Sequence, residues 1–388
     1  MKNLFETIEL LKAQISGVAG SEVVSLENAL GRVLAQDLKA CKDLPEYDNS
    51  ALDGYAFKFA DKDNPLSVKG TIFAGDKANY TIGKNECYKI MTGAKMPLGA
   101  DTILRVEDAT LENGKVLIKM PIKEKDGHRI KGEELKSGAN LMKKGRILGA
   151  ADIMTLASQG IYKVQVVRKV RVGVFSSGNE LYEPWQKADE NSIYNANALA
   201  ISALLSNALC EVSYLGIIKD DLSATKQALA NAHFDLLITS GGASVGDADF
   251  MSEALLNLGF DALFEGIIIR PAKPTKLYKK GERLVFILPG NPLSAFLSCF
   301  LVGRALLRLL GGTSFEFDFV EAEFKGNLAL KNGRNNLILG TLQGNSFVAN
   351  ENLGIMKAFN STHLLISDFS KSEFKNKERV KLLKILDF

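Results

Sequence analysis

The sequence predicts a multidomain α/β protein with a doubly wound α/β domain, a split helical domain carrying a β insertion, and a small C-terminal β domain. Three observations predict this fold class. The chain has 388 residues, more than the roughly 100–200 of one ordinary domain. Residues 169–310 alternate apolar strands, polar loops and helical spacing. Residues 55–130 and 311–388 instead hold short β-branched or aromatic runs broken by Gly, Asn and Pro.

The N-terminal residues 1–40 are predicted to be helical. Leu4, Ile8 and Leu11 recur on one face of a helix, and a second amphipathic stretch runs from Leu26 to Leu38. Mixed patterning returns at 132–168, so we expect 1–40 and 132–168 to form one split helical and linker domain.

A β insertion is predicted between these two parts, over residues 41–131. No long helical pattern interrupts this segment, and Gly, Asn and Pro separate its apolar runs. The expected strands are 68–73, 87–91, 102–106 and 115–122.

The α/β domain, residues 169–310, is predicted to hold a mainly parallel sheet, because each strand runs into a loop and then a helical pattern. The expected strands are 170–175, 211–218, 234–239 and 284–288, and helices are expected over 196–209, after 221 and from 293. The remaining residues, 311–388, are predicted to form a small β domain with strand candidates at 319–324, 336–342 and 380–386.

The composition excludes several function classes. Lys plus Arg number 48 and Asp plus Glu 45, giving a formal net charge of +3, so neither nucleic acid nor an anionic membrane is expected as the main partner. Four cysteines and three histidines are scattered without a CxxC or zinc-ligand spacing, which argues against a disulfide framework or a structural zinc site. Acidic residues interrupt the N-terminal apolar positions, and no uncharged apolar run reaches about 18 residues. We therefore expect a cytoplasmic protein without a membrane span.

A glycine-rich loop follows the strand at 234–239. Ser240-Gly241-Gly242 and Ser244-Val245-Gly246 offer two glycine steps flanked by hydroxyls, and glycine lets backbone amides approach an anion closely. A phosphate cradle is the functional interpretation, and an ordinary βα turn is the alternative.

Carboxylates also follow the predicted strands. Glu180, Asp220 and Asp249 each come after a strand of one sheet, so they can face a common crevice. Oxygen ligands beside a phosphate suit Mg²⁺. Helix N-capping is the alternative, and for Asp220 the two interpretations are evenly matched.

A basic loop, Arg270-Pro271-Ala272-Lys273-Pro274-Thr275-Lys276, carries three cations and two prolines. Such a loop can bind an anion. From spacing alone, a solvated basic loop is the stronger interpretation.

Five motifs, in this order and spacing, resemble the molybdopterin molybdenumtransferase family, which includes MoeA and the gephyrin E domain. They are Asp48-Asn-Ser-Ala-Leu-Asp-Gly-Tyr-Ala56, Ile90-Met-Thr-Gly-Ala94, Ser176-Ser-Gly-Asn-Glu180, Ser240-Gly-Gly-Ala-Ser-Val-Gly-Asp-Ala-Asp249 and Leu288-Pro-Gly-Asn-Pro-Leu-Ser-Ala295. The resemblance covers nearly the whole chain. It implies a homodimer with a molybdopterin-binding α/β domain, a C-terminal β-barrel-like domain, and an active cleft shared between subunits.

The resemblance also implies a reaction: adenylylated molybdopterin and molybdate give molybdenum cofactor and AMP, assisted by Mg²⁺. Matching positions imply catalytic roles for Asp53, Thr92, Glu134, Glu180, Asp220 and Asp249, of which Glu180, Asp220 and Asp249 would hold the metal. The implied positions for phosphate and pterin are Ser176, Ser177, Gly178, Ser240, Gly241, Gly242, Ser244, Gly246, Pro289, Gly290, Asn291 and Pro292. Those for molybdate are Arg270, Lys273 and Lys276. A molybdopterin adenylyltransferase and downstream molybdoenzyme chaperones are the expected protein partners.

The chain departs from the family pattern at several positions. Glu134 replaces an Asp in Gly-Glu-Asp, and Asn195 replaces an acid in Tyr-Asp-x-Asn. Leu339 and Ile355 align with an Arg and a Ser that help hold molybdate, with Arg334 five residues from Leu339. These departures leave open whether the C-terminal domain completes the oxyanion site.

Other functions compete with this one. A molybdopterin-binding scaffold or a paralogue with an altered oxyanion site fits the departures, and tungstate differs little from molybdate in size and charge. A molybdopterin adenylyltransferase resembles only residues 169–310, so the first 168 residues argue against it.

Overall fold

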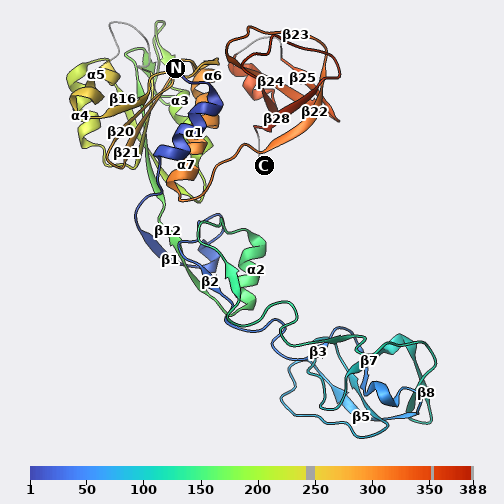
Figure 1. Cartoon of the computed structure of the whole chain (residues 1–388). Coiled ribbons are helices and arrows are strands. Elements are labelled where there is room, and N and C mark those ends of the chain that lie inside the picture. The colour runs from blue at the N-terminus through green and yellow to red at the C-terminus, as the bar shows by residue number, and fades with distance from the viewer. Residues whose placement is uncertain (242–249, 351–353, 386–388) are drawn as a thin grey trace. The chain divides into compact units, whose positions relative to one another are not determined.

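The fold is taken from a computed structural model that describes residues 1–241, 250–350 and 354–385. Two compact units make up the chain. The insertion unit comprises Asp37–Lys144 and Met154–Tyr162, and the α/β–barrel unit comprises Met1–Gln36, Gly145–Ile153 and Lys163–Phe388. Figure 1 labels the elements of both units.

The insertion unit is built on a six-stranded sheet in the order β7-β4-β6-β5-β9-β8. Alternating side chains supply two apolar clusters, one around Phe57 and Leu66 and the other around Ile72 and Ile90. Its elements are β2 (Leu38–Lys39), β3 (Asn49–Ser50), β4 (Gly54–Phe57), η2 (Phe59–Asp61), β5 (Leu66–Ile72), β6 (Glu86–Ile90), β7 (Thr102–Arg105), η3 (Val106–Asp108), β8 (Ala109–Glu112), β9 (Lys115–Ile118), β10 (His128–Arg129) and β11 (Asn140–Met142). The four strands predicted here are confirmed as β5, β6, β7 and β9.

A second six-stranded sheet forms the α/β part, in the order β16-β13-β17-β21-β20-β18. The first four strands are parallel, and β20 and β18 add an antiparallel edge. The strands are β13 (Val170–Ser177), β16 (Cys210–Ile218), β17 (Leu236–Ser240), β18 (Asp261–Phe264), β20 (Lys276–Lys280) and β21 (Arg283–Leu288); β14 (Leu181–Tyr182) and β15 (Ile193–Tyr194) form a separate pair. The predicted mainly parallel sheet is confirmed.

Helices cover both faces of this sheet, as Figure 1 shows. Val172 and Ile238 point into the cluster shared with one set of helices, while Leu237 and Ile287 point into the cluster on the other face. The helices are α1 (Leu4–Gln14), α3 (Asn197–Leu205), α6 (Pro292–Ser298), η4 (Cys299–Gly303) and α7 (Arg304–Leu310) on the first face and α4 (Leu222–Asn231) and α5 (Phe250–Asn257) on the second. Because both faces are buried, the central strands are apolar on both sides, which confirms the doubly wound α/β prediction.

The C-terminal residues form a closed five-stranded barrel, as the sequence predicts. The ring runs β24-β25-β22-β28-β26 and closes because β26 also pairs with β24. Its elements are β22 (Phe319–Lys325), β23 (Leu328–Ala329), β24 (Asn335–Gln343), β25 (Ser346–Ala349), α8 (Ile355–Phe359), β26 (His363–Ile366), β27 (Glu373–Phe374) and β28 (Arg379–Lys384). A short strand of the α/β part, β19 (Ile269–Arg270), pairs with β24 and fastens the basic loop to the barrel.

The predicted helix from Leu26 to Leu38 is wrong. Only η1 (Leu26–Asn28) is helical there, and Gly31 then adopts φ +75°. Val33 and Leu34 instead form bridges to Ile147 and Val166, so their apolar side chains are buried through strand-like pairing. Periodicity alone does not separate these two ways of burying the same residues.

The predicted N-terminal helix is confirmed as α1, and Leu4, Ile8 and Leu11 are buried. This helix packs against the apolar cluster of the α/β part, together with residues of α7. The chain then forms β1 (Ser21–Ser25), which pairs with β12 (Lys163–Val167), and α2 (Ala150–Ser158) runs across the boundary between the units. The four predicted domain ranges stay predictions.

One continuous helix, Pro292–Leu310, is long and apolar enough to span a membrane by length and composition alone. Its most apolar window is 78% buried within the protein, where it supplies much of the α/β core. A core helix passes the same test, so this segment is weak support for a membrane span.

Candidate active site

The carboxyl ends of β13, β16, β17 and β21 meet at one edge of the parallel sheet. The Ser177 hydroxyl donates to Asp220 Oδ1 at 3.1 Å, which links the ends of β13 and β16. The backbone N–H of Gly241 donates to the carbonyl of Leu288 at 3.2 Å, which links the ends of β17 and β21. Ligands of open α/β sheets bind at this edge.

Gly241 is required by the close approach of two strand ends. It adopts φ +91°, and a Cβ there would lie 2.2 Å from the carbonyl oxygen of Ser177. No side chain fits at that distance, so the backbone of Gly241 lies close to the end of β13. The predicted cradle residues Gly242, Ser244 and Gly246, and the predicted metal ligand Asp249, lie outside the described residues.

A chain of hydrogen bonds supports this edge from behind. Ser176 Oγ donates to Asn195 Oδ1 at 2.8 Å and lies 3.1 Å from Ser240 Oγ. Asn195 Nδ2 donates to Tyr214 Oη at 2.9 Å, and that hydroxyl donates to Glu183. Both serines are buried, so their hydroxyls hold the strand ends together; burial and then Glu183 raise the pKa of Tyr214.

Asn195 explains one departure from the family pattern. Its amide accepts from Ser176 and donates to Tyr214, whose hydroxyl is therefore free to donate to Glu183. An ionised carboxylate at this position could accept hydrogen bonds but could not donate one. Asn195 thus places the negative charge of this network on Glu183. Sequence reasoning missed Tyr214 and Glu183, because only the fold brings these separate segments together.

Asp220 faces the edge, and Asp221 caps the following helix. Asp221 Oδ1 accepts from the backbone N–H of Ala224 at 2.7 Å, so capping of α4 does not require Asp220. Asp220 instead accepts from Ser177 and from the backbone N–H of Asn179, at 3.1 Å and 3.3 Å. Glu180 is exposed, and its carboxylate folds beside Gly178, where a Cβ would lie 2.7 Å from Glu180 Oε2.

These two carboxylates supply the oxygen donors that a divalent cation prefers. Among the residues the structure describes, no group of three or more His, Cys, Asp or Glu side chains is placed to hold a metal ion. With Asp249 outside that set, the metal assignment stays a prediction.

The segment Pro289–Pro292 closes the same edge beside β21. Asn291 Oδ1 accepts from the backbone N–H of Ser294 at 3.2 Å and caps α6, whose first residue is Pro292. Asn197 Nδ2 donates to the carbonyl of Gly290 at 2.9 Å. Within the described residues, Asn197 Oδ1 is buried without a hydrogen-bond partner.

The basic loop presents two exposed cations on a fixed backbone. Thr275 Oγ1 donates to the carbonyl of Ala272 at 2.7 Å, and β19 pairs with the barrel strand β24. Arg270 and Lys273 are exposed, and in the described part of the chain neither side chain forms an ion pair. Ala272 is buried and adopts φ +92°, a conformation that favours glycine.

Arg334 lies beside this loop because of the pairing of β19 with β24. Ile269 is opposite Asn335, and burial and then the positive charge of Arg270 lower the pKa of Arg334. Arg334 Nε donates to Asn336 Oδ1 at 3.1 Å. Three cations lie on this loop and its paired strand: Arg270, Lys273 and Arg334, here called the oxyanion cluster.

The two barrel positions that depart from the family pattern carry apolar side chains, which cannot hydrogen-bond to an oxyanion. Leu339 is 1% exposed and packs in the core, and Ile355 is an exposed apolar residue of α8. Lys276 also differs from its neighbours on the loop, because it is buried on β20 and its ammonium donates to Ser252 Oγ of α5 at 3.0 Å. Lys276 therefore contacts α5, unlike the exposed Arg270 and Lys273.

In the insertion unit, Asp53 and Thr92 are in contact. Asp53 Oδ1 accepts from the Thr92 backbone N–H and hydroxyl, both at 2.7 Å, and these bonds lower the pKa of Asp53. Gly54 allows this turn, since a Cβ there would lie 2.2 Å from the carbonyl oxygen of Leu104. Glu134 is exposed and pairs with Arg129. Among the described residues, no hydrogen bond or ion pair joins Glu134 to Asp53.

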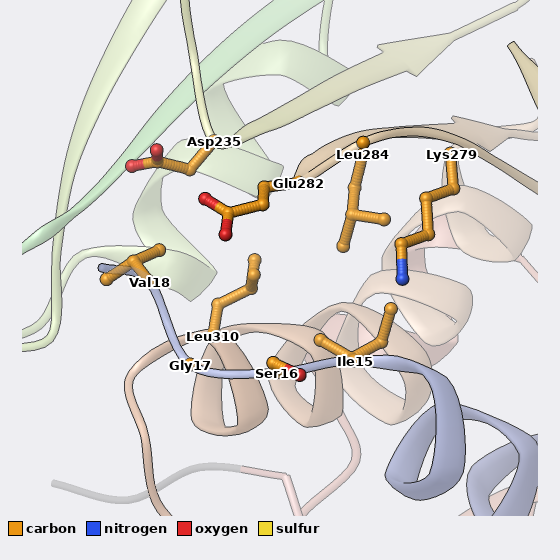
Figure 2. Close-up of a pocket in the computed structure, with 10 residues that line it drawn as sticks. Ile15, Ser16, Gly17, Val18, Asp235, Lys279, Glu282, Leu284 and Leu310 are labelled. Carbon is orange, nitrogen blue, oxygen red and sulfur yellow. The ribbon is translucent and has the colours of Figure 1, made fainter.

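A small pocket lies at the opposite edge of the α/β sheet, where β17 and β21 begin (Figure 2). Its volume is about 100 Å³, and the linker after α1 forms one wall. Arg168 donates to both oxygens of Asp235, at 2.7 Å and 2.9 Å, and Lys279 donates to the carbonyl of Gln14 at 2.7 Å. These contacts fasten the linker to the sheet, which is a structural role.

The fold and the glycine-lined edge define a class of α/β proteins that bind anionic ligands at the carboxyl ends of their strands. Two family models match: "MoeA N-terminal region (domain I and II)" over residues 3–160 and "Probable molybdopterin binding domain" over 173–308. The molybdopterin molybdenumtransferase of Haemophilus influenzae is 35% identical over 297 residues, covering 75% of this chain and 73% of its own length. That of a Nostoc species is 33% identical, covering 83% and 77%.

Solved structures agree over the full length. A molybdopterin biosynthesis MoeA protein from Pyrococcus horikoshii is 26% identical, with a TM-score of 0.87 and coverage of 99% of this chain and 100% of that chain. A second structure of a Pyrococcus MoeA protein is 28% identical, with a TM-score of 0.82 and coverage of 100% and 99%. This chain belongs to the molybdopterin molybdenumtransferase family.

Proposed function

We propose that this protein is a molybdopterin molybdenumtransferase, which inserts molybdate into adenylylated molybdopterin and releases AMP. The oxyanion cluster is the observation that carries the proposal. Within the described residues, Arg270, Lys273 and Arg334 have no carboxylate partner, so a tetrahedral dianion is the ligand that would neutralise them. Family membership supports the same reaction.

The edge of the parallel sheet would bind the organic substrate. Gly241 brings backbone close to the end of β13, and the buried Asn197 Oδ1 offers an acceptor to a donor on the pterin. Pro289, Gly290 and Asn291 would line the same side. Asp220 and Glu180, with Asp249, would hold Mg²⁺, whose chemistry is to neutralise charge on phosphate oxygens.

We further propose a homodimer with a composite active site. The support is that Asp53, Thr92 and Glu134 belong to the insertion unit, whereas the glycine-lined edge belongs to the α/β–barrel unit. Mixing an Asp53→Ala subunit with an Asp220→Ala subunit should then restore activity, because one site of the heterodimer keeps both groups. Verified heterodimers without recovery would contradict the shared site.

A reconstitution assay tests the function itself. Pure protein, adenylylated molybdopterin, Mg²⁺ and molybdate should yield AMP and active cofactor, the latter read out by activation of an apo-molybdoenzyme. Tungstate in place of molybdate measures the selectivity between the two oxyanions. Substrate binding without AMP release or cofactor formation would favour the alternative, a molybdopterin-binding scaffold.

A further inference from the structure

A second cationic pocket lies away from the candidate active site, where α7, the linker 311–318 and the barrel strand β28 meet. Its volume is about 290 Å³, so it is larger than the pocket in Figure 2. Aromatic, aliphatic and charged side chains line it: Phe300, Arg304, Arg308, Phe315, Glu316, Phe317, Asp318, Val320, Leu383 and Lys384.

Two arginines of α7 line the pocket one helical turn apart. Residues at i and i+4 share a helix face, so Arg304 and Arg308 extend from the same side of α7. The Arg304 guanidinium lies over the Phe300 ring, 4.8 Å from its centroid, which holds it in place. Arg308 is half-buried, and its pKa is lowered by burial and then by the charge of Arg304.

Neither guanidinium has an acidic partner among the residues the structure describes. The two carboxylates on the pocket wall do not neutralise them: Glu316 pairs with Lys12 at 2.5 Å, and Asp318 forms no ion pair with either arginine. A partly buried guanidinium without a partner is costly, because it loses hydration and gains no hydrogen bond in return. This pair therefore favours a bound anion.

The linker wall of the pocket is held in place and carries two phenylalanines. Phe315 and Phe317 pack edge to face with centroids 5.1 Å apart, and Phe317 also packs against Phe5 of α1 at 6.1 Å. The Lys12–Glu316 ion pair holds the same linker against α1. The pocket thus combines fixed phenylalanine rings with two arginines, and Glu316 and Asp318 lie on the same linker as the rings.

We propose that this pocket binds a phosphate monoester with a flat apolar body, its phosphoryl group on Arg304 and Arg308. Two guanidiniums match a dianion that offers three oxygens, whereas a carboxylate brings one charge and two oxygens. The volume exceeds what an inorganic oxyanion fills, and the phenylalanines would contact the organic part. This site is independent of the reaction proposed above.

Titration calorimetry with phenyl phosphate, inorganic phosphate and benzoate tests the proposal. At pH 7.5 the phosphate monoester is mostly a dianion, since its second pKa is about 6. Phenyl phosphate should bind most tightly, and raising the salt concentration should weaken it. Arg308→Gln should lower its affinity by about tenfold or more, the effect of losing a charge-assisted hydrogen bond.

Matched variants separate this pocket from other anion sites. Arg379→Gln removes an exposed arginine of β28 outside the pocket, and Arg270→Ala removes one cation of the oxyanion cluster. Both variants should leave phenyl phosphate affinity unchanged. Arg308→Lys keeps the charge and should retain part of the binding. Binding that survives Arg308→Gln and Arg304→Gln, no binding at millimolar concentration, or benzoate binding as tightly as phenyl phosphate would each overturn the proposal.

Discussion

Replacing Ala272 with glycine should not destabilise the protein, although the residue is 5% exposed and its methyl group packs in the α/β core. The reason is its φ of +92°, which an L-residue adopts only with strain. Relief of such strain is worth about 1–3 kcal/mol. Two effects of glycine oppose this gain. Glycine raises the conformational entropy of the unfolded chain, which costs about 0.4–1 kcal/mol, and it removes a buried methyl group, which costs about 0.8 kcal/mol. Middle values leave a net stabilisation of about 0.5 kcal/mol.

Ala305→Gly is the matched control, because Ala305 is equally buried but lies within α7. Without strain to relieve, that substitution should cost about 2 kcal/mol. Differential scanning calorimetry should then show an unchanged or slightly higher transition temperature for Ala272→Gly. Ala305→Gly should lower it by about 4–8 °C. Equal losses in both variants would refute the assignment of strain to the basic loop.

Three further predictions concern the edge of the sheet, the insertion unit and the pocket opposite. Gly241→Ala should lower the free energy of unfolding by about 2 kcal/mol or more and abolish substrate binding, because the added Cβ would lie 2.2 Å from the Ser177 carbonyl oxygen. Gly216→Ala is the control: Gly216 has a similar positive φ, but a Cβ there meets nothing within 4 Å, so this variant measures backbone strain without the clash. Thr92→Val removes one of the two hydrogen bonds that lower the pKa of Asp53, so the acidic side of the plot of activity against pH should move to higher pH. If the acidic side of that plot does not move, Asp53 does not titrate in the reaction. Burial opposes ionisation of Asp235, but hydrogen bonds from Arg168 and the Arg171 backbone lower its pKa overall. The stability that Asp235 contributes should therefore be present above the ordinary pKa of an aspartate and be lost as the pH falls through the lowered pKa of the folded state. Asp235→Asn should flatten this acid dependence of the unfolding free energy in urea titrations, and a profile identical to that of the wild type would contradict the prediction.

Much of the fold is predictable from local pattern. The strands of the α/β domain are apolar because both faces of the sheet are covered by helices, and glycine and polar residues follow their carboxyl ends. Both features are visible in the sequence, so β13, β17 and β21 and the loops after them can be located from it. The apolar spacing from Leu26 to Leu38 predicts a helix that does not form. Gly31 has a positive φ, and long-range β-bridges bury the same side chains through strand-like pairing.

The candidate site depends more on long-range pairing. Arg334 joins Arg270 only because β19 pairs with the barrel strand β24, and no local signal reveals that pairing. The glycine steps predict a phosphate contact for Ser240, and the resemblance implies one for Ser176. In the structure both hydroxyls are buried and contact each other, and Ser176 also contacts Asn195. Sequence identifies which residue types gather at an edge, and the packing decides which of their atoms face a ligand.

Calorimetric titration of molybdate tests the oxyanion cluster most directly. The wild-type protein should bind molybdate, and Arg334→Ala, Arg270→Ala and Lys273→Ala should each weaken binding by about tenfold or more, the loss expected for a charge-assisted contact. Lys381→Ala, which removes an exposed cation on the barrel strand β28, should leave the affinity unchanged. Equal molybdate affinities in the wild type and all four variants would contradict the account, because the basic loop and Arg334 would then be solvated surface.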